Sequence, residues 1–397
     1  MDTVVLGLQW GDEGKGKLCD ELAAAHAAAV RFQGGANAGH TVIRDGVKLA
    51  LHQLPCGALH PGVRSVIAAG CAVDPAALRA EAEDLGLAPD RLTVSARAQV
   101  VPPWFRLIDA AEERLREDGA VGTTGRGIGP TYAAKAGRWG ITAGELADPG
   151  ARAARLAAIL PWHHRWLAAL GLDAPAWPGA DELGEWLRPF VADDLVAIAA
   201  ARAAGTVLFE GQLGLMRDPD RGLQPAATGA SVLPPAALVG PTPRVIGVAK
   251  PYVTMVGGGG FPTEITGPDA DVLRERGDEY GATTGRPRRC GWLDLPALRY
   301  AARAAGATHL AMQMKLDGLA ALGRMPVCVA YAGWDEARGY PLPHEMARLR
   351  PVYEDWGLPG DPLALARRIA AAVGLPLAYA GTGAARGEAV WEPEARL

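Results

Sequence analysis

The sequence has little lysine, little cysteine and no long apolar run. Lysine supplies only six of the 40 basic residues, and arginine supplies the rest. The five cysteines include no CxxC pair, which argues against a disulfide framework or a zinc site and favours a reducing compartment. No stretch reaches about 18 uninterrupted apolar residues, and the N-terminus lacks the regions of a signal peptide. We therefore expect a soluble, cytoplasmic protein with no membrane partner.

The chain also lacks a surplus of positive charge. Its formal net charge is −4 and its isoelectric point is near 6.1, which does not favour binding to nucleic acid. Hydrophobic residues make up 49% of the 397 residues and charged residues 21%, as in ordinary soluble enzymes. We therefore expect small-molecule partners rather than nucleic acid.

Short β-branched apolar runs alternate with Ala-, Leu- and Arg-rich amphipathic segments. This alternation predicts an α/β fold with a mostly parallel sheet. The expected strands are residues 4–8, 206–209, 245–256, 309–314 and 375–380. The expected helices are residues 18–29, 105–117, 151–170, 181–204, 295–305 and 363–373. The Pro-rich residues 233–244 are interpreted as a surface connection, so residues 1–397 are predicted to form a single domain.

A glycine-rich loop follows the first expected strand. Residues 11–17 read GDEGKGK and have the GxxxxGK spacing between a strand and a helix, where loop amides and a helix N-terminus bind phosphate. Leu18 stands where a Walker motif has the hydroxyl ligand of magnesium. Asp12 and Glu13 place acidic groups inside the loop, where they would repel phosphate unless they carry chemistry or hold a metal. The loop predicts a nucleotide-phosphate site of a non-standard type.

Another expected strand ends in a K-x-D tripeptide, Lys315–Leu–Asp317. In GTP-binding P-loop proteins such a carboxylate accepts from the guanine N–H groups while the lysine stem packs on the base. The tripeptide alone is weak evidence for guanine binding, but together with the N-terminal loop it favours GTP over ATP.

Two further segments, residues 122–130 and 281–291, contain TTGR. They offer hydroxyls, free amides and cations, among them Lys135 and Arg138 after the first and Arg286, Arg288 and Arg289 in the second. Arginine binds phosphate or carboxylate with two parallel donors. The substrates are therefore expected to be anionic.

Taken together, the motifs resemble the adenylosuccinate synthetase family. They are QWGDEGKGK (9–17), GGANAGHTV (34–42), GTTGRGIGPTY (122–132), FPTE (261–264), GDEYGATTGRPRRCGWLD (277–294) and KLD (315–317). The resemblance implies a single elaborated α/β unit with a P-loop-like GTP-binding core, working as a homodimer. It also implies ligation of L-aspartate to the purine 6-position of IMP, with GTP hydrolysed and Mg²⁺ as cofactor.

The resemblance implies roles for individual residues. Asp12 would remove the N1 proton, and His40 would stabilise the transferring phosphoryl group and act as an acid. Asp12 and the Gly39 carbonyl would hold Mg²⁺. Residues implied for GTP are Gly14, Lys15, Gly16, Lys17, Thr41, Arg288, Lys315 and Asp317. Residues implied for IMP are Asn37, Thr124, Arg138, Thr228 and Arg286, with Arg138 reaching into the partner's site. Residues implied for aspartate are Thr283, Thr284, Arg286 and Arg288.

The nucleotide-base loop departs from the family. The family segment is close to FEGAQG…LDIDHGTYPxVTSSN, whereas residues 209–231 read FEGQLGLMRDPDRGLQPAATGAS. Leu213 stands where a glutamine contacts the reacting edge of the base, and Arg221 replaces the histidine of DHG. Met255 stands where an arginine is usual, and the guanine-side residues 382–386 read TGAAR instead of TGPDR. The identity of the purine base therefore stays open, and so does the choice between GTP and ATP.

Two alternatives remain beside the synthetase itself. One is a paralogue that performs the same amination on another purine nucleotide, such as a 2-amino, a deoxy or an antibiotic-precursor nucleotide. The other is a non-catalytic GTP-binding regulator, which predicts loss of Asp12 or His40, yet both residues are present.

Overall fold

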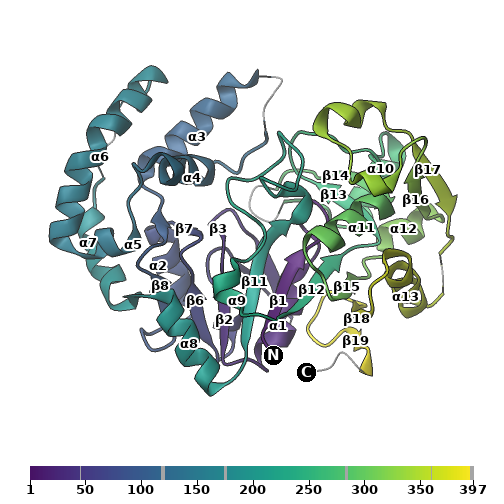
Figure 1. The fold of residues 1–397 in the computed structure, drawn as a ribbon, viewed down its shortest axis with the longest axis horizontal. Coiled ribbons are helices and arrows are strands. Elements are labelled where there is room, and N and C mark those ends of the chain that lie inside the picture. The colour runs from purple at the N-terminus through teal and green to yellow at the C-terminus, as the bar shows by residue number, and fades with distance from the viewer. Residues whose placement is uncertain (45, 118–120, 174–176, 282–284, 359, 394–397) are drawn as a thin grey trace.

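A computed structural model describes residues 1–44, 46–117, 121–173, 177–281, 285–358 and 360–393. Within these ranges, a ten-stranded sheet crosses the centre of the molecule (Figure 1). Its strands in order are β10 (Val191–Ala192), β8 (Leu92–Ser95), β6 (Arg64–Ile67), β2 (Ala28–Arg31), β11 (Val207–Gly214), β1 (Thr3–Gly7), β12 (Arg244–Ala249), β15 (His309–Gln313), β18 (Leu377–Gly381) and β19 (Ala389–Trp391). All neighbours pair in parallel except β18 and β19, so the predicted α/β fold with a mostly parallel sheet is confirmed.

Strand β1 lies at the middle of this sheet. Thr3 is paired with Leu208 of β11 on one side and with Arg244 of β12 on the other. Every residue of β1 is buried, as expected for a strand that is covered on both faces. The carboxyl ends of parallel strands meet at one edge of the sheet, where ligands bind in open α/β folds.

Helices cover both sides of the sheet (Figure 1). They are α1 (Lys15–Ala23), α2 (Pro75–Asp84), α3 (Pro103–Leu115), α4 (Ile128–Gly137), α5 (Ala143–Ala147), α6 (Pro149–Ala169), α7 (Ala180–Leu187), α8 (Asp194–Ala204), α9 (Ala236–Val239), α10 (Pro268–Arg276), α11 (Leu295–Ala304), α12 (Asp317–Leu322) and α13 (Pro362–Val373). Smaller sheets comprise β13 (Tyr252–Met255), β14 (Arg289–Asp294), β16 (Pro326–Tyr331) and β17 (Pro351–Asp355), and β3 (Gly34–Gly35), β7 (Cys71–Val73) and β9 (Gln99–Val100). Strands β4 (His40–Arg44) and β5 (Val47–Leu51) form a hairpin.

Three predicted elements are wrong in their extent. The helix expected over 18–29 ends at Ala23, because residues 28–31 pair with β11 and β6 as strand β2. The helix expected over 181–204 is divided into α7 and α8, since Pro189 lies in the break and the Asp193 carboxylate caps α8. The strand expected over 245–256 is divided into β12 and β13 at Lys250–Pro251.

In the described ranges, no helix combines the length and the apolar character needed to cross a bilayer. The single-domain organisation of residues 1–397 stays a prediction.

Candidate active site

The glycine loop connects β1 to α1 at the carboxyl edge of the sheet. Gly14 has a φ of +85° and begins α1, so Lys15 and Gly16 form the first turn of the helix. Asp12 also has a positive φ, +59°, which is uncommon for a residue with a side chain and concentrates at functional sites. The strand–loop–helix context required of a phosphate-binding loop is therefore present.

The buried Glu13 side chain fills the inside of this loop. Its Oε1 accepts from the backbone N–H groups of Gln9 at 3.1 Å and of Gly11 at 2.8 Å, and its Oε2 accepts from Lys15 Nζ at 2.6 Å. An acidic residue in the loop thus serves as an anchor that fixes the loop amides. This role could not be assigned from the sequence, because the identity of residue 13 as glutamate does not show the direction of its side chain.

The imidazole of His40 lies against a buried acid–base cluster. Its Nδ1 lies 2.6 Å from Glu210 Oε1, and Arg31 Nη1 lies 3.2 Å from the same oxygen. The backbone N–H of Cys56 donates to Glu210 Oε2 at 2.8 Å. A Cβ added to Gly16 would lie 3.2 Å from His40 Cβ, so His40 sits beside the first turn of α1.

Charge in this cluster is fixed by burial and by neighbours. Burial raises the pKa of Glu210, but His40 and Arg31 outweigh it and lower the pKa to about 2. Because an ionised carboxylate only accepts, His40 Nδ1 carries the shared proton. Burial and the Arg31 charge lower the pKa of His40 against the opposing effect of Glu210, so the ring is neutral at pH 7 in the free protein.

Asp12 is held by a second buried cluster. Arg288 Nε lies 2.8 Å from Asp12 Oδ2, and Arg288 Nη1 donates to Glu279 Oε2 at 2.5 Å. Lys250 and Lys315 also contact Glu279, at 2.9 and 3.2 Å. Burial raises the pKa of Glu279, but Lys250, Lys315 and Arg288 together lower it to about 2. The Asp12 side chain is 40% exposed and remains open to a ligand.

The K-x-D tripeptide follows β15, the strand next to β12. Lys315 contacts Glu279, and Asp317 is exposed at the start of α12. Gln313 Nε2 donates to the Gly14 carbonyl at 3.1 Å, which links this strand end to the phosphate loop. The structure therefore brings the two predicted GTP motifs together.

Lys17 is directed away from the loop centre. Its Nζ donates to the carbonyls of Gly383 and Glu388, both at 2.7 Å, and so ties α1 to the guanine-side loop. Thr41 is half-buried on β4, and its carbonyl lies 3.2 Å from a Cβ added to Gly16. Contact of Lys17 or Thr41 with GTP phosphates stays a prediction.

Gln212 lies one position before the glutamine of the family segment, and its side chain is committed to other contacts. Gln212 is buried, accepts from the Gly35 N–H at 2.9 Å, and donates to Asn37 Oδ1 at 2.8 Å. Leu213, whose Cδ2 lies 4.0 Å from a Cβ added to Gly11, has a φ of +63°, a strained value for a leucine. Gln212 thereby occupies the amide oxygen of Asn37, a contact that could not be read from the sequence.

The two TTGR segments approach each other. A Cβ added to Gly122 would lie 2.7 Å from Gly257 Cα and 3.7 Å from Arg286 Nη1. The amides at the start of the first segment are already bonded, because Glu113 accepts from the N–H groups of residues 121–123. Thr124 is half-buried in this loop. Thr283 and Thr284 lie outside the described residues.

Arg138 lies at the far end of α4, in a left-handed conformation with a φ of +68°. Its side chain is exposed, and its carbonyl accepts from Arg155 Nη2 at 3.0 Å. The neighbouring Trp139 ring is 4.9 Å from that of Trp162, which is 45% exposed. Within the described ranges, no hydrogen bond or ion pair joins Arg138 to Asp12 or His40.

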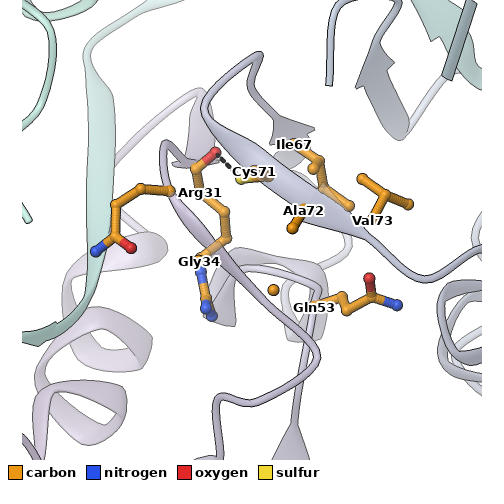
Figure 2. A pocket seen from close by; sticks show the side chains of 9 residues that line it. Arg31, Gly34, Gln53, Ile67, Cys71, Ala72 and Val73 are labelled. Carbon is orange, nitrogen blue, oxygen red and sulfur yellow. Dashed lines mark hydrogen bonds between the residues drawn. The ribbon is translucent and has the colours of Figure 1, made fainter. Parts of the chain in front are cut away.

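Figure 2 shows a cavity behind Arg31, lined by Gly34, Gln53 and the strand that contains Cys71, Ala72 and Val73. Its volume is about 10 Å³, which suits one water molecule at most. It is too small for a nucleotide.

The donors present suit a magnesium ion bound with substrate phosphates. Asp12 offers a partly exposed carboxylate, and Gly39 precedes β4 with a backbone carbonyl; Mg²⁺ prefers such oxygen ligands. Within the described ranges, the side-chain cluster with metal-binding spacing is His40, Cys56 and Glu210. In that cluster Glu210 forms an ion pair with Arg31, and Asp12 is not a member, so the cluster does not resemble a magnesium site.

The fold and the glycine loop are those expected of an α/β enzyme that binds nucleotides. A sequence model described as adenylosuccinate synthetase matches residues 4–390. An adenylosuccinate synthetase of Myxococcus xanthus is 41% identical over 98% of both chains, and one of Cyanothece sp. is 42% identical over 91% of this chain and 85% of its own. The chain belongs to the adenylosuccinate synthetase family, whose members are GTP-dependent ligases that form a C–N bond.

Solved structures agree with this assignment. The fully ligated adenylosuccinate synthetase of Plasmodium falciparum superposes with a TM-score of 0.91 at 31% identity, covering 98% of this chain and 99% of its own. The succinoaminodeoxyadenylate synthetase of cyanophage S-2L, bound to dGMP and dATP, has a TM-score of 0.64 at 19% identity, covering 98% of this chain and 95% of its own. At this identity, the likeness to the phage enzyme supports the fold alone.

Proposed function

We propose that this protein ligates L-aspartate to the 6-position of IMP, with hydrolysis of GTP to GDP and phosphate. The observation that carries the proposal is the pairing of two reactive groups at one glycine loop. Asp12 contacts Arg288, while His40 contacts Glu210 and lies beside the first turn of α1, which supports a base and a phosphoryl-stabilising group at one loop.

The chemistry explains why both groups are needed. A purine 6-oxygen is a poor leaving group and must first be phosphorylated. Asp12 takes the N1 proton, the 6-oxygen attacks the γ-phosphorus of GTP, and GDP leaves. The aspartate amine then attacks C6 and phosphate leaves. His40 stabilises the charge on the transferring phosphoryl group and acts as the acid.

The remaining predicted residues divide by substrate. GTP is bound by Gly14, Lys15, Gly16, Lys17, Thr41 and Arg288, with Lys315 and Asp317 on guanine. IMP is bound by Asn37, Thr124, Thr228, Arg286 and the partner's Arg138, and aspartate by Thr283, Thr284, Arg286 and Arg288. The ion pair of Arg288 with Asp12 supports a role in orienting the base as well.

Asp12 and the Gly39 carbonyl would hold Mg²⁺, which when bound neutralises charge on the phosphates. Both are oxygen donors, and Asp12 keeps an open side toward a ligand. All five cysteines are free and buried, which suits the reducing cytoplasm that we propose as the place of action.

We also propose a homodimer in which Arg138 completes the partner's site. The exposed Arg138 beside the exposed Trp162 supports this arrangement. Mixing inactive Asp12→Asn and Arg138→Leu proteins tests it. If Arg138 acts across the dimer, hybrids contain one intact site and activity returns on mixing. If Arg138 acts within its own chain, each site in a hybrid keeps one defect and no activity returns.

A paralogue acting on another purine nucleotide is the second candidate, favoured by Leu213 at the base-contacting position. Release of phosphate from GTP, measured with aspartate and with IMP, GMP or dGMP, separates the candidates. Efficient release with IMP supports the synthetase. Release only with another nucleotide supports the paralogue, and none with any nucleotide supports a non-catalytic regulator.

A further inference from the structure

Arg217 in the base loop and Met255 elsewhere in the chain depart from the family in opposite ways. In the family segment …LDIDHG, the position of Arg217 holds leucine, whereas Met255 stands where the family has arginine. One position has gained the guanidinium that the other has lost. Such an exchange is informative only if the two positions are neighbours in space.

The structure places them side by side. Arg217 Nη1 donates to the carbonyl of Val256, the residue after Met255, at 2.9 Å. The carbonyl of Arg217 accepts from the N–H of Thr228 at 2.7 Å, and Thr228 is one of the residues proposed for IMP. The preceding Met216 donates its N–H to the Gln9 carbonyl at 3.1 Å, which fixes this segment against the phosphate loop.

Met255 cannot supply a cation, and its neighbour Arg289 is already engaged. Met255 is 1% exposed, and its sulfur lies 3.7 Å from Arg289 Nη1. Arg289 forms two hydrogen bonds with Glu264 and also donates to the carbonyls of Gly257 and Gly259. Arg217 is therefore a guanidinium that this side of the site can present to a ligand.

Most donors of Arg217 are unused. A guanidinium has five N–H donors, and within the described ranges the side chain makes one hydrogen bond, to Val256, and no ion pair. Burial lowers the pKa of Arg217, while Asp12 and Glu13 oppose the shift, so the group lies within electrostatic reach of the catalytic loop. A half-buried cation with spare donors lacks the acceptors that would offset its desolvation.

The ligand that fits is a planar pair of acceptors. A 6-oxopurine presents N7 and the 6-oxygen side by side, and the arginine fork matches that pair. Leu213 offers no donor to the same base. We infer that Arg217 reads the base: its guanidinium donates to the N7 and 6-oxygen edge of the purine in place of the missing glutamine and arginine. This inference rests on the proposed function and deepens it.

The inferred contact makes Arg217 a specificity-determining residue. A 6-oxopurine accepts at both atoms, whereas a purine with a 6-amino group has N–H donors at that position and meets the guanidinium unfavourably. The ligated product also carries hydrogen on its 6-nitrogen. Arg217 should therefore favour substrate over product.

Calorimetric titration of the full-length protein with IMP and with 7-deaza-IMP, which lacks the N7 acceptor, tests the contact. Wild-type protein should bind 7-deaza-IMP about tenfold more weakly than IMP, since a hydrogen bond to a charged group is lost. Arg217→Leu should bind IMP about tenfold or more weakly and no longer distinguish the two ligands. Arg217→Leu with Met255→Arg should regain IMP affinity.

Arg303→Leu, which removes an exposed arginine on α11, is the matched control and should change neither affinity. Arg217→Gln keeps part of the donor set and serves if Arg217→Leu does not fold. An unchanged IMP affinity in folded Arg217 variants, or an undiminished preference for IMP over 7-deaza-IMP, overturns the inference. Turnover of the wild type is measured separately: absence of turnover contradicts the proposed function, while the binding comparison still decides the role of Arg217.

Discussion

The two sides of the candidate site differ in how their residues are held. On the phosphate side, Asp12 and His40 each contact a buried cluster in which one carboxylate joins several partners. On the base side, Leu213, Arg217 and Met255 all depart from the family segment. A group held by several partners cannot change alone without leaving a buried charge unpaired. A side chain held by a single hydrogen bond, as Arg217 is by Val256, is more easily exchanged with a neighbour, as we infer for positions 217 and 255.

The largest effect is expected from Asp12→Asn. Loss of the general base should lower kcat by about 10³-fold, with nucleotide affinity largely retained. The side chain is partly exposed, so the melting temperature should change little. Steady-state kinetics and thermal unfolding measure both, with the exposed Asp84→Asn as control. Retained activity would mean that the phosphate side is as exchangeable as the base side and that the base is misassigned.

Removing a cluster carboxylate should have the next largest effect. The folded-state pKa of Glu210 is about 2 against an ordinary 4.5, so its stabilisation is complete above about pH 4.5 and is lost as the pH falls toward 2. This amounts to about 3 kcal/mol. Glu210→Gln should lower the free energy of unfolding at pH 7 by about that amount and flatten its acid dependence. Denaturant unfolding at several pH values measures this.

Glu279→Gln offers the matched variant, because the pKa of Glu279 is also about 2 and falls in the same window. Similar losses would show that the two clusters are equivalent. A Glu210 variant that keeps its stability and its acid dependence would contradict the account of the phosphate side.

Two neighbouring substitutions examine the base side with smaller effects. Gln212→Ala removes the partner of Asn37 and should weaken IMP binding by about five- to tenfold. Leu213→Gln restores the residue of the family segment and should raise kcat/KM for IMP by up to about tenfold. Binding and steady-state measurements with IMP decide. If Gln212→Ala had no effect and Leu213→Gln lowered activity, the present base loop would be adapted to another base.

The smallest expected effect is the uptake of a proton by His40 when GTP binds. His40 is neutral in the free protein because burial and Arg31 lower its pKa. Its Nδ1 proton is committed to Glu210, so donation from Nε2 needs a second proton, and a bound phosphate should raise the pKa. We expect GTP binding at pH 7 to take up a fraction of a proton in the wild type and none in His40→Asn. Calorimetry in buffers of different ionisation enthalpy measures the uptake; equal values in both proteins would exclude this protonation.

The sequence predicted the elements with clear boundaries and missed the contacts that cross between them. The phosphate loop, the K-x-D strand end and most helices lie where periodicity and glycine spacing placed them. The helix over 18–29 was overextended because alanine-rich residues suit both a helix and a buried strand. Glu210, Glu279 and Arg31 could not be assigned, because their roles depend on partners more than 100 residues away or on the direction of a buried side chain.

The Glu13 carboxylate has a consequence for the energetics of binding. By occupying the N–H groups of Gln9 and Gly11, it gives the loop its final shape before any nucleotide arrives. Ordering of a mobile loop normally consumes part of the interaction energy of a ligand. A loop templated by its own side chain avoids that loss, so more of the phosphate interaction remains for distinguishing the transition state from the ground state.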